Sequence, residues 1–321
     1  WTYEGIKLKE VESVGAGEIA MMSGLDGVLI SDTIADPSAP EELPAIQVEP
    51  STLSMNFYAN NSPLAGKDGG KYLTIHKIRD RLLKEEAVSV SITVDPDSPA
   101  DTVKVAARGE LQLAVLIETM RREGYELSVG KPRVILHKEG DKTLEPFETL
   151  VVEVPNDKLG PVMELTGARR GQLVHMGNRG EFAHAVFSIP ARGLIGLRTR
   201  LLNATRGEAI MHHRFESFRE VEGDIPKRAN GVIISQDNGK AVAFALWKLQ
   251  ERGRMFVSPG DPLYEGIIIG IHSRDNDLVV NPIKGKQLTN VRASGTDEAV
   301  RLVPPIQVTL ESAIEFIADD E

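Results

Sequence analysis

The sequence of 321 residues contains no cysteine and no apolar run long enough to cross a bilayer. The missing cysteines exclude disulfides, thiolate metal sites and cysteine nucleophiles, and they fit a reducing compartment. The first twelve residues carry acids and lysines instead of an apolar stretch, so they predict neither a signal peptide nor a membrane anchor. We therefore expect a cytoplasmic protein that does not enter the membrane.

The motifs of nucleotide and metal chemistry are also missing. A phosphate-binding loop requires Gly, four residues, Gly-Lys and then Ser or Thr, and the four Gly-Lys pairs here are followed by Asp, Pro, Ala and Gln. No His-Glu-x-x-His motif occurs, and without cysteine a zinc site would need histidines and carboxylates from distant segments. We predict that this chain neither hydrolyses nucleotides nor binds a metal.

Arginine is concentrated in one segment of an otherwise acidic chain. The formal net charge is -10, yet residues 161–215 hold eight arginines, three acids and no lysine. Guanidinium groups donate hydrogen bonds in pairs and are weakly hydrated, so they suit planar recognition of phosphate or carboxylate. The segment predicts a polyanionic partner, with solvated surface charge as the alternative.

Alternating patterns predict an α+β fold with two tandem ferredoxin-like βαββαβ units. Apolar residues in period two indicate strands, and apolar residues at helical spacing with charges opposite indicate helices. The first unit is predicted to have strands at 52–59, 88–94, 102–107 and 125–136 and helices at 72–83 and 110–123. The second is predicted to have strands at 148–154, 172–176, 183–189 and 209–215 and helices at 158–168 and 196–204.

The two ends of the chain follow other patterns. Residues 10–36 indicate short strands broken by glycines, too few to close a barrel, and a proline-rich linker follows. After Glu216 the frequent turns indicate a mainly β domain with strands at 242–249 and 264–272 and one helix at 309–317. The sequence lacks an initiating Met and opens in a strand-like segment, so we expect a piece of a longer protein.

Two other functions stay open on the residues alone. His212 and His213 are adjacent, so on a strand they point to opposite faces and cannot bind one metal from the same side. A hydrolase that uses one of them is disfavoured, because no orienting acid lies near in sequence and only a distant one could serve. Tandem ferredoxin-like folds also bind metabolites between domains, which leaves a small-molecule-binding regulatory module as the alternative function.

A second basic segment lies near the C-terminus. Residues 281–295 read NPIKGKQLTNVRASG and hold three basic residues and no acid. Small polar and basic side chains suit contact with an RNA backbone or a phosphate. The segment has no aromatic residue, which argues against base-specific readout of a single strand. We predict a loop that approaches RNA.

Several long motifs resemble one family. The runs GEIAMMSGLDGVLISDTIAD, SPLAGKDGGKYLTIHKIRDR, ARGELQLAVLIETMRREGYEL and IPARGLIGLRTRL resemble the second, third and fifth domains of translational GTPases such as elongation factor G. The run NGVIISQDNGKAVAFALWKLQERG and those after it closely resemble the C-terminal domain of the BipA/TypA family of these GTPases. The resemblance implies a C-terminal fragment without the G domain.

The resemblance also implies the parts and partners of this chain. It divides the chain into the end of a β-barrel domain at 1–42, a third-domain-like fold at 43–140, a fifth-domain-like fold at 141–219 and a family-specific domain at 220–321. It implies a ribosome-associated protein of large-subunit assembly and stress adaptation, monomeric, whose GTP and Mg²⁺ are bound in the absent G domain. The expected contacts are large-subunit ribosomal RNA and the acceptor end of an A-site tRNA. The basic residues within the matching motifs, which we assign to these contacts, are Arg108, Arg169, Arg170, Arg192, Arg198, Arg200, Lys284, Lys286 and Arg292.

Overall fold

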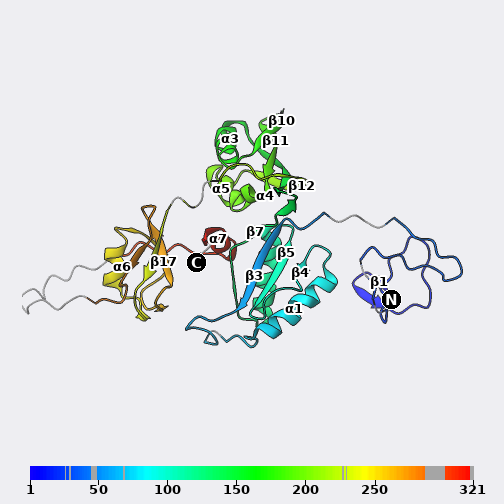
Figure 1. Cartoon of the computed structure of the whole chain (residues 1–321), viewed down its shortest axis with the longest axis horizontal. Coiled ribbons are helices and arrows are strands. Elements are labelled where there is room, and N and C mark those ends of the chain that lie inside the picture. Colours follow the sequence, from blue (N-terminus) through cyan, green and yellow to red (C-terminus); the bar gives the residue numbers. More distant parts are fainter. Residues whose placement is uncertain are drawn as a thin grey trace, which may run out of the picture.

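Three folded units and an N-terminal segment follow one another along the chain (Figure 1). The computed structural model describes residues 1–25, 27, 28, 30–44, 49–67, 69–225, 228, 230–285 and 301–318. Within these parts, none of the helices combines the length and apolar character that a bilayer crossing requires.

The first α+β unit has the predicted order of strand, helix, two strands, helix and strand. Its strands form an antiparallel sheet in the order β4-β5-β3-β6, with a short strand β7 also paired to β3. This order is that of a ferredoxin-like fold. The elements are β3 (Leu53–Ala59), α1 (Ile75–Val88), β4 (Thr93–Val94), β5 (Thr102–Ala107), α2 (Glu110–Glu123), β6 (Leu127–Val129) and β7 (Arg133–Val134).

Alternation along the strands builds the core of this unit. Every second residue of β3 and β5 is buried beneath the two helices, which cover one face of the sheet with Ile78 and Leu82 from α1 and Leu113 from α2. Helix α2 ends where the sequence predicts, because Gly124 takes a left-handed conformation at φ 94° and closes the last turn.

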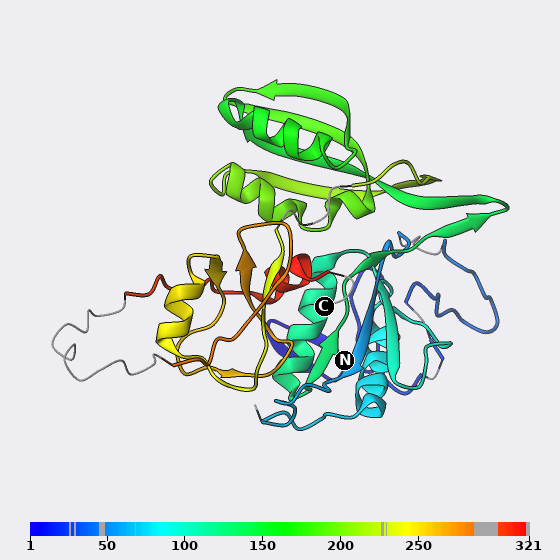
Figure 2. The same ribbon diagram turned by 60° about the vertical axis from the view of Figure 1, so that its left-hand side comes forward.

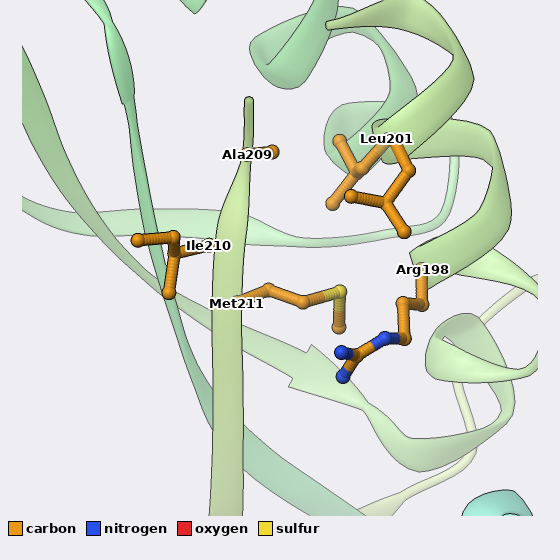
Figure 3. A pocket seen from close by; sticks show the side chains of 6 residues that line it. Arg198, Leu201, Ala209, Ile210 and Met211 are labelled. Carbon is orange, nitrogen blue, oxygen red and sulfur yellow. The ribbon is translucent and has the colours of Figure 1, made fainter. Parts of the chain in front are cut away.

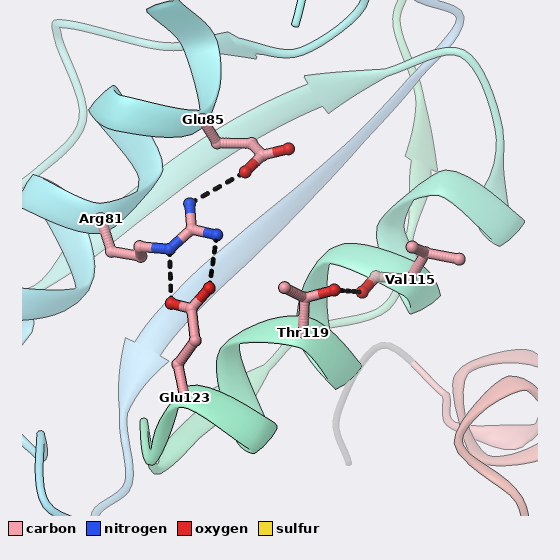
Figure 4. A network of polar contacts seen from close by, with 5 residues as sticks. All are labelled: Arg81, Glu85, Val115, Thr119 and Glu123. Carbon is pink, nitrogen blue, oxygen red and sulfur yellow. Dashed lines mark hydrogen bonds and ion pairs between the residues drawn. The ribbon is translucent and has the colours of Figure 1, made fainter. Parts of the chain in front are cut away.

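A bidentate ion pair links the two helices at the surface (Figure 4). Arg81 of α1 donates from Nε and Nη2 to the carboxylate of Glu123 on α2, at 2.6 and 2.9 Å, and from Nη1 to Glu85 at 2.9 Å. The planar guanidinium matches the carboxylate geometry, which fixes the register of one helix against the other.

The second α+β unit repeats the topology. Its sheet has the order β10-β11-β9-β12, with the short strand β8 also paired to β9. The two units together confirm the predicted α+β fold class. The elements are β8 (His137–Glu139), β9 (Lys142–Pro155), the short 3-10 helix η1 (Asn156–Lys158), α3 (Leu159–Gly167), β10 (Gln172–Arg179), β11 (Phe182–Pro190), α4 (Ala191–Leu194), α5 (Leu197–Ala204) and β12 (Ile210–Glu220).

The third unit is built on a four-stranded sheet in the order β15-β17-β13-β18, in which β13 and β18 are parallel. A further two-stranded sheet pairs β14 with β16. The elements are β13 (Val232–Ser235), β14 (Gly239–Lys240), α6 (Ala243–Leu249), β15 (Gly253–Met255), β16 (Pro262–Leu263), β17 (Ile268–His272) and β18 (Leu278–Val280).

Three expected strands are corrected by the structure. Residues 243–249 form helix α6 because a short apolar run cannot be assigned by periodicity alone, and its alanines and leucines favour a helix. Residues 84–88 extend α1, since lysine and glutamate propagate the helix, so the strand shrinks to β4. The described residues between 10 and 36 form no strand; the strands β1 (Thr2–Glu4) and β2 (Lys7–Lys9) precede them.

The last helix leaves the third unit and packs on the first. Helix α7 (Leu310–Phe316) begins with a capping box at Thr309, as the predicted helix at 309–317 requires. Ile314 is fully buried in the core of the first unit, and Leu310 packs beside it. In Figure 1 α7 lies between the first and third units, below the second, and Figure 2 shows it beside the third unit as well. Its Phe316 packs edge-on against Phe256 of the third unit, with ring centroids 5.5 Å apart.

Candidate nucleic-acid interface

Helix α5 holds two of the predicted contact residues at the surface. Leu197 and Leu201 face the core of the second unit, and the helical turn then leaves Arg198 and Arg200 exposed on the other side. Figure 3 shows the guanidinium of Arg198 beside the side chain of Met211 from β12, at the edge of a small cavity of about 130 Å³. These two arginines are free to face a polyanion.

Arg192 has a different environment from the exposed one that we expected. Its Nε and Nη2 donate to the carboxylate of Glu145 at 2.6 and 3.0 Å, and Nη2 also donates to the carbonyl of Glu222 at 2.8 Å. The side chain of Glu145 is 1% exposed and that of Arg192 is 21% exposed. A guanidinium that neutralises a buried carboxylate holds the fold together and has little left to offer an RNA phosphate.

Arg169 is likewise an internal residue. It is buried, and its Nη1 donates to the backbone carbonyls of Gly193 and Ile195 at 2.8 and 2.6 Å. Burial, with the nearby charge of Arg200, lowers the pKa of Arg169 to about 10. Its neighbour Arg170 is exposed, adopts a left-handed backbone with φ 65°, and donates from Nε to the carbonyl of Asp224.

The remaining predicted residues lie in two further places. Arg108 precedes α2 in the first unit and lines a cavity of about 500 Å³ together with Arg198 of the second unit. Lys284 is exposed just after the turn that follows β18 of the third unit. Lys286 and Arg292, with the rest of the expected 281–295 loop beyond Gly285, lie outside the described residues.

The adjacent histidines face opposite sides of the second sheet, as expected of neighbours on a strand. His213 lines the larger cavity, and its Nδ1 donates to Glu148 of β9, which raises the pKa of His213. Glu148 is therefore the distant acid that a hydrolase would need. Ser91 also lines the cavity, but its hydroxyl accepts a hydrogen bond from Gln112 at 2.6 Å and does not bond to His213. The arrangement gives no nucleophile activated by a base.

Acids of two elements, α2 and α7, meet where α7 joins the two units. Glu110 at the start of α2 accepts a hydrogen bond from the Gly196 amide at 3.2 Å, and Glu315 of α7 accepts one from the Thr199 hydroxyl at 2.7 Å. Burial and the charge of Glu315 raise the pKa of Glu110 from 4.5 to about 7. Burial also raises the pKa of Glu315. This junction therefore binds protons more tightly in the folded protein than in the unfolded chain.

The free energy of unfolding is expected to fall as the pH rises from 5 to 7. A carboxyl group with a raised pKa in the fold keeps its proton longer than in the unfolded chain, so its ionisation destabilises the fold. The shift of Glu110 from 4.5 to about 7 corresponds to roughly 3 kcal/mol at most. The raised pKa of His213 acts in the same direction, because its stabilising charge is lost as the pH rises.

Urea denaturation of the Glu110→Gln variant at pH 5, 6, 7 and 8 checks this. The variant should lose most of the pH slope and be more stable than the parent above pH 7. Glu118→Gln is the matched control on the same helix, since its exposed carboxylate has a pKa lowered to about 2 by Arg121 and Arg122. Equal slopes in the parent and Glu110→Gln would contradict the assignment.

The open face of the second sheet is a basic surface that the sequence reasoning did not find. Strand pairing places the unburied residues of neighbouring strands side by side on the face away from α3 and α5. Glu153 is the acid among them and lies near Arg179 and His184, at 3.8 and 3.9 Å. The basic residues of this open face are His175, Arg179, His184, His212 and Arg214. The sequence does show basic and apolar residues alternating along each strand. Which basic residues lie side by side on one face follows only from the pairing register of the strands.

Neither a phosphate-binding loop in the sequence nor a metal-binding cluster among the described side chains is available for GTP and Mg²⁺. The sequence motif is missing, and within the described ranges no group of three or more histidine, aspartate and glutamate residues could hold an ion. The residues present do not fit a nucleotide site. No chemical step on a nucleotide is assigned to this chain.

Comparison with known proteins gives matches along the whole chain. Residues 142–229 match the family described as elongation factor G C-terminus, and residues 230–321 match the TypA/BipA C-terminal domain. The large ribosomal subunit assembly factor BipA of Salmonella typhimurium is 47% identical over 322 positions, which cover 100% of this chain and 53% of the relative.

Relatives with the same description occur in other bacteria. That of Escherichia coli K12 is 47% identical over 99% of this chain and 52% of its own length. That of Bacillus subtilis is 41% identical, with the same coverage of both chains. The chain therefore spans about half the length of the curated relatives that it matches.

Proposed function

Because the chain carries a TypA/BipA C-terminal domain directly behind an elongation factor G C-terminus, we propose that it is the ribosome-docking region of a BipA-type GTPase. In this proposal the whole protein acts in assembly of the large ribosomal subunit and in stress adaptation, and its G domain binds GTP and Mg²⁺. The part described here supplies RNA contacts without chemistry of its own, in the cytoplasm and as a monomer.

The observation that carries the proposal is exposed arginine on both sides of the second sheet. Arg200 on α5 and Arg214 on β12 are exposed, and the ion pairs of the described residues include neither of them. The chain as a whole is acidic, so it does not attract polyanions over its entire surface. A polyanion would therefore bind where exposed guanidinium groups are present. Ribosomal RNA of the large subunit fits this requirement and the names of the relatives.

The third unit adds a second proposed contact. Lys284 is exposed where the chain leaves β18, and we propose that residues 281–295 approach the acceptor end of an A-site tRNA. Lys284 keeps its assignment as an RNA contact in this proposal, and so do Arg108, Arg170 and Arg198.

Association with purified large ribosomal subunits should weaken steeply as salt rises from 50 to 200 mM, because each neutralised phosphate releases counterions. The double variant Arg200→Gln and Arg214→Gln should reduce the slope of log affinity against log salt by about 2 and leave the melting temperature unchanged. Sedimentation of the chain with the subunits at several salt concentrations measures both quantities. Arg198 is kept in this variant because it also lines the larger cavity.

The control exchanges Arg121 and Arg122 of the first unit for glutamine. These arginines are as exposed, but both are paired with Glu118. The control should bind as the parent does. A complete lack of association at 50 mM salt, or an unchanged slope in the Arg200 and Arg214 variant, would overturn the proposal.

A further inference from the structure

The larger cavity lies between the two α+β units. The first unit contributes the residues before and within the first turns of α2, and the second contributes the segment from α4 to α5 and strand β12. Its volume of about 500 Å³ falls within the range of about 300–1,000 Å³ that small-molecule sites occupy. Pockets at the junction of two domains are a common location of such sites.

Most of the wall is apolar and comes from both units. An apolar wall of this extent favours a ligand with an apolar body, because the complex is stabilised when hydrocarbon surface is removed from water. The apolar residues of the lining are Leu53, Leu111, Val115, Ala191, Leu194, Ile195 and Met211.

Arg108 is the main cation of this wall. Its Nε is buried and has no hydrogen-bond partner among the described residues. The guanidinium of a lining arginine suits an anionic ligand, because it donates hydrogen bonds in pairs to carboxylate or phosphate oxygens. Across the cavity, Arg198 of the second unit is exposed and takes part in none of the ion pairs found among the described residues.

The acids of the lining do not cancel these charges. Glu148 is engaged by His213 and lies 3.1 Å from the hydroxyl of Thr52. Glu110 accepts the Gly196 amide, and its pKa of about 7 leaves it about half protonated at neutral pH. Two arginines therefore line a cavity whose carboxylates are paired or about half protonated, which favours an anion over a cation or a neutral ligand.

We propose that the cavity binds a small organic anion, an apolar ring that carries one carboxylate or phosphate group, with the anionic group between Arg108 and Arg198. The ring lies against the leucines and valine of the lining. Because the two arginines belong to different units, the bound ligand joins them and stabilises one relative orientation. This function shares Arg108 and Arg198 with the proposed RNA docking but does not depend on it.

Isothermal titration of the 321-residue chain with benzoate, phenyl phosphate and benzamide at pH 7 and 150 mM NaCl tests the proposal. Benzoate or phenyl phosphate should bind with one site per chain and at least ten times more tightly than uncharged benzamide. The tighter of the two anions identifies the group that the site prefers. Equal binding of benzamide, or no binding of either anion at concentrations up to about 10 mM, would overturn the proposal.

Variants locate the site. Arg108→Gln should weaken anion binding at least tenfold, whereas Arg206→Gln, an exposed arginine outside the lining, should bind as the parent does. Leu111→Trp places an indole at an exposed position of the lining and should block binding without loss of the folded circular dichroism spectrum. If Arg108→Gln does not fold, Leu111→Trp decides alone. Unchanged binding in a folded Arg108→Gln or Leu111→Trp variant would show that the anion binds elsewhere.

Discussion

Replacing Arg192 with alanine is expected to lower the free energy of unfolding of the second unit by about 3–5 kcal/mol. The substitution leaves the carboxylate of Glu145 buried, with neither of its two guanidinium hydrogen bonds. Breaking a buried pair on one side is costly because the remaining charge has lost both water and partner. Thermal and urea denaturation of the chain, followed by circular dichroism, measure the loss.

The double variant Arg192→Leu with Glu145→Leu removes both charges of the ion pair together. Removing both charges leaves none uncompensated, so this variant should be much more stable than Arg192→Ala alone. Arg122→Ala is the surface control, since its side chain is 76% exposed and its ion pair with Glu118 should contribute little to stability. A loss below about 1 kcal/mol in Arg192→Ala would show that the buried carboxylate has another partner.

Replacing Ile314 with alanine should destabilise the attachment of α7 to the first unit by about 2–5 kcal/mol. Ile314 is fully buried among residues of the first core, and removing its methyl groups leaves a cavity at the contact with α2. A chain with several units need not unfold in one step, so the local readout is preferable. Hydrogen exchange of the α7 amides, and of those of α2 beneath it, should accelerate markedly.

Val308→Ala is the matched control for this helix. Val308 lies just before the N-cap of α7 and is exposed, so the same kind of truncation removes almost no contact. Its amide exchange should equal that of the parent. If Ile314→Ala exchanged no faster than Val308→Ala, the contact between α7 and the first core would not hold the helix in solution.

The sequence was sufficient for the two α+β units because their signals are local. Apolar alternation marks β3 and β11, and helical spacing followed by Gly124 marks α2 to the residue. A short apolar run without periodicity does not distinguish a helix from a strand, and for that reason the sequence predicted a strand where α6 forms. Local pattern therefore predicts elements well when length and a stop signal accompany the period.

The candidate site was less predictable because its partners are distant in sequence. Glu145 lies 47 residues before Arg192, and Glu148 lies 65 residues before His213, so neither pairing leaves a trace in a motif. In the sequence, an arginine flanked by glycine and apolar residues gives the same pattern whether its side chain faces solvent or a buried carboxylate. Only the tertiary packing that brings Glu145 of β9 beside α4 distinguishes Arg192 from Arg200.

The return of α7 to the first unit attaches the third unit at two places. The chain enters the third sheet after β12 and leaves it again through the residues that lead to α7, whose end is fixed in the first core. Phe316 of α7 also packs against Phe256 of the third unit, so the one helix contacts both units. A shift of α7 on the first core would therefore be transmitted to the third unit, and also to α5, where Glu315 accepts a hydrogen bond from Thr199.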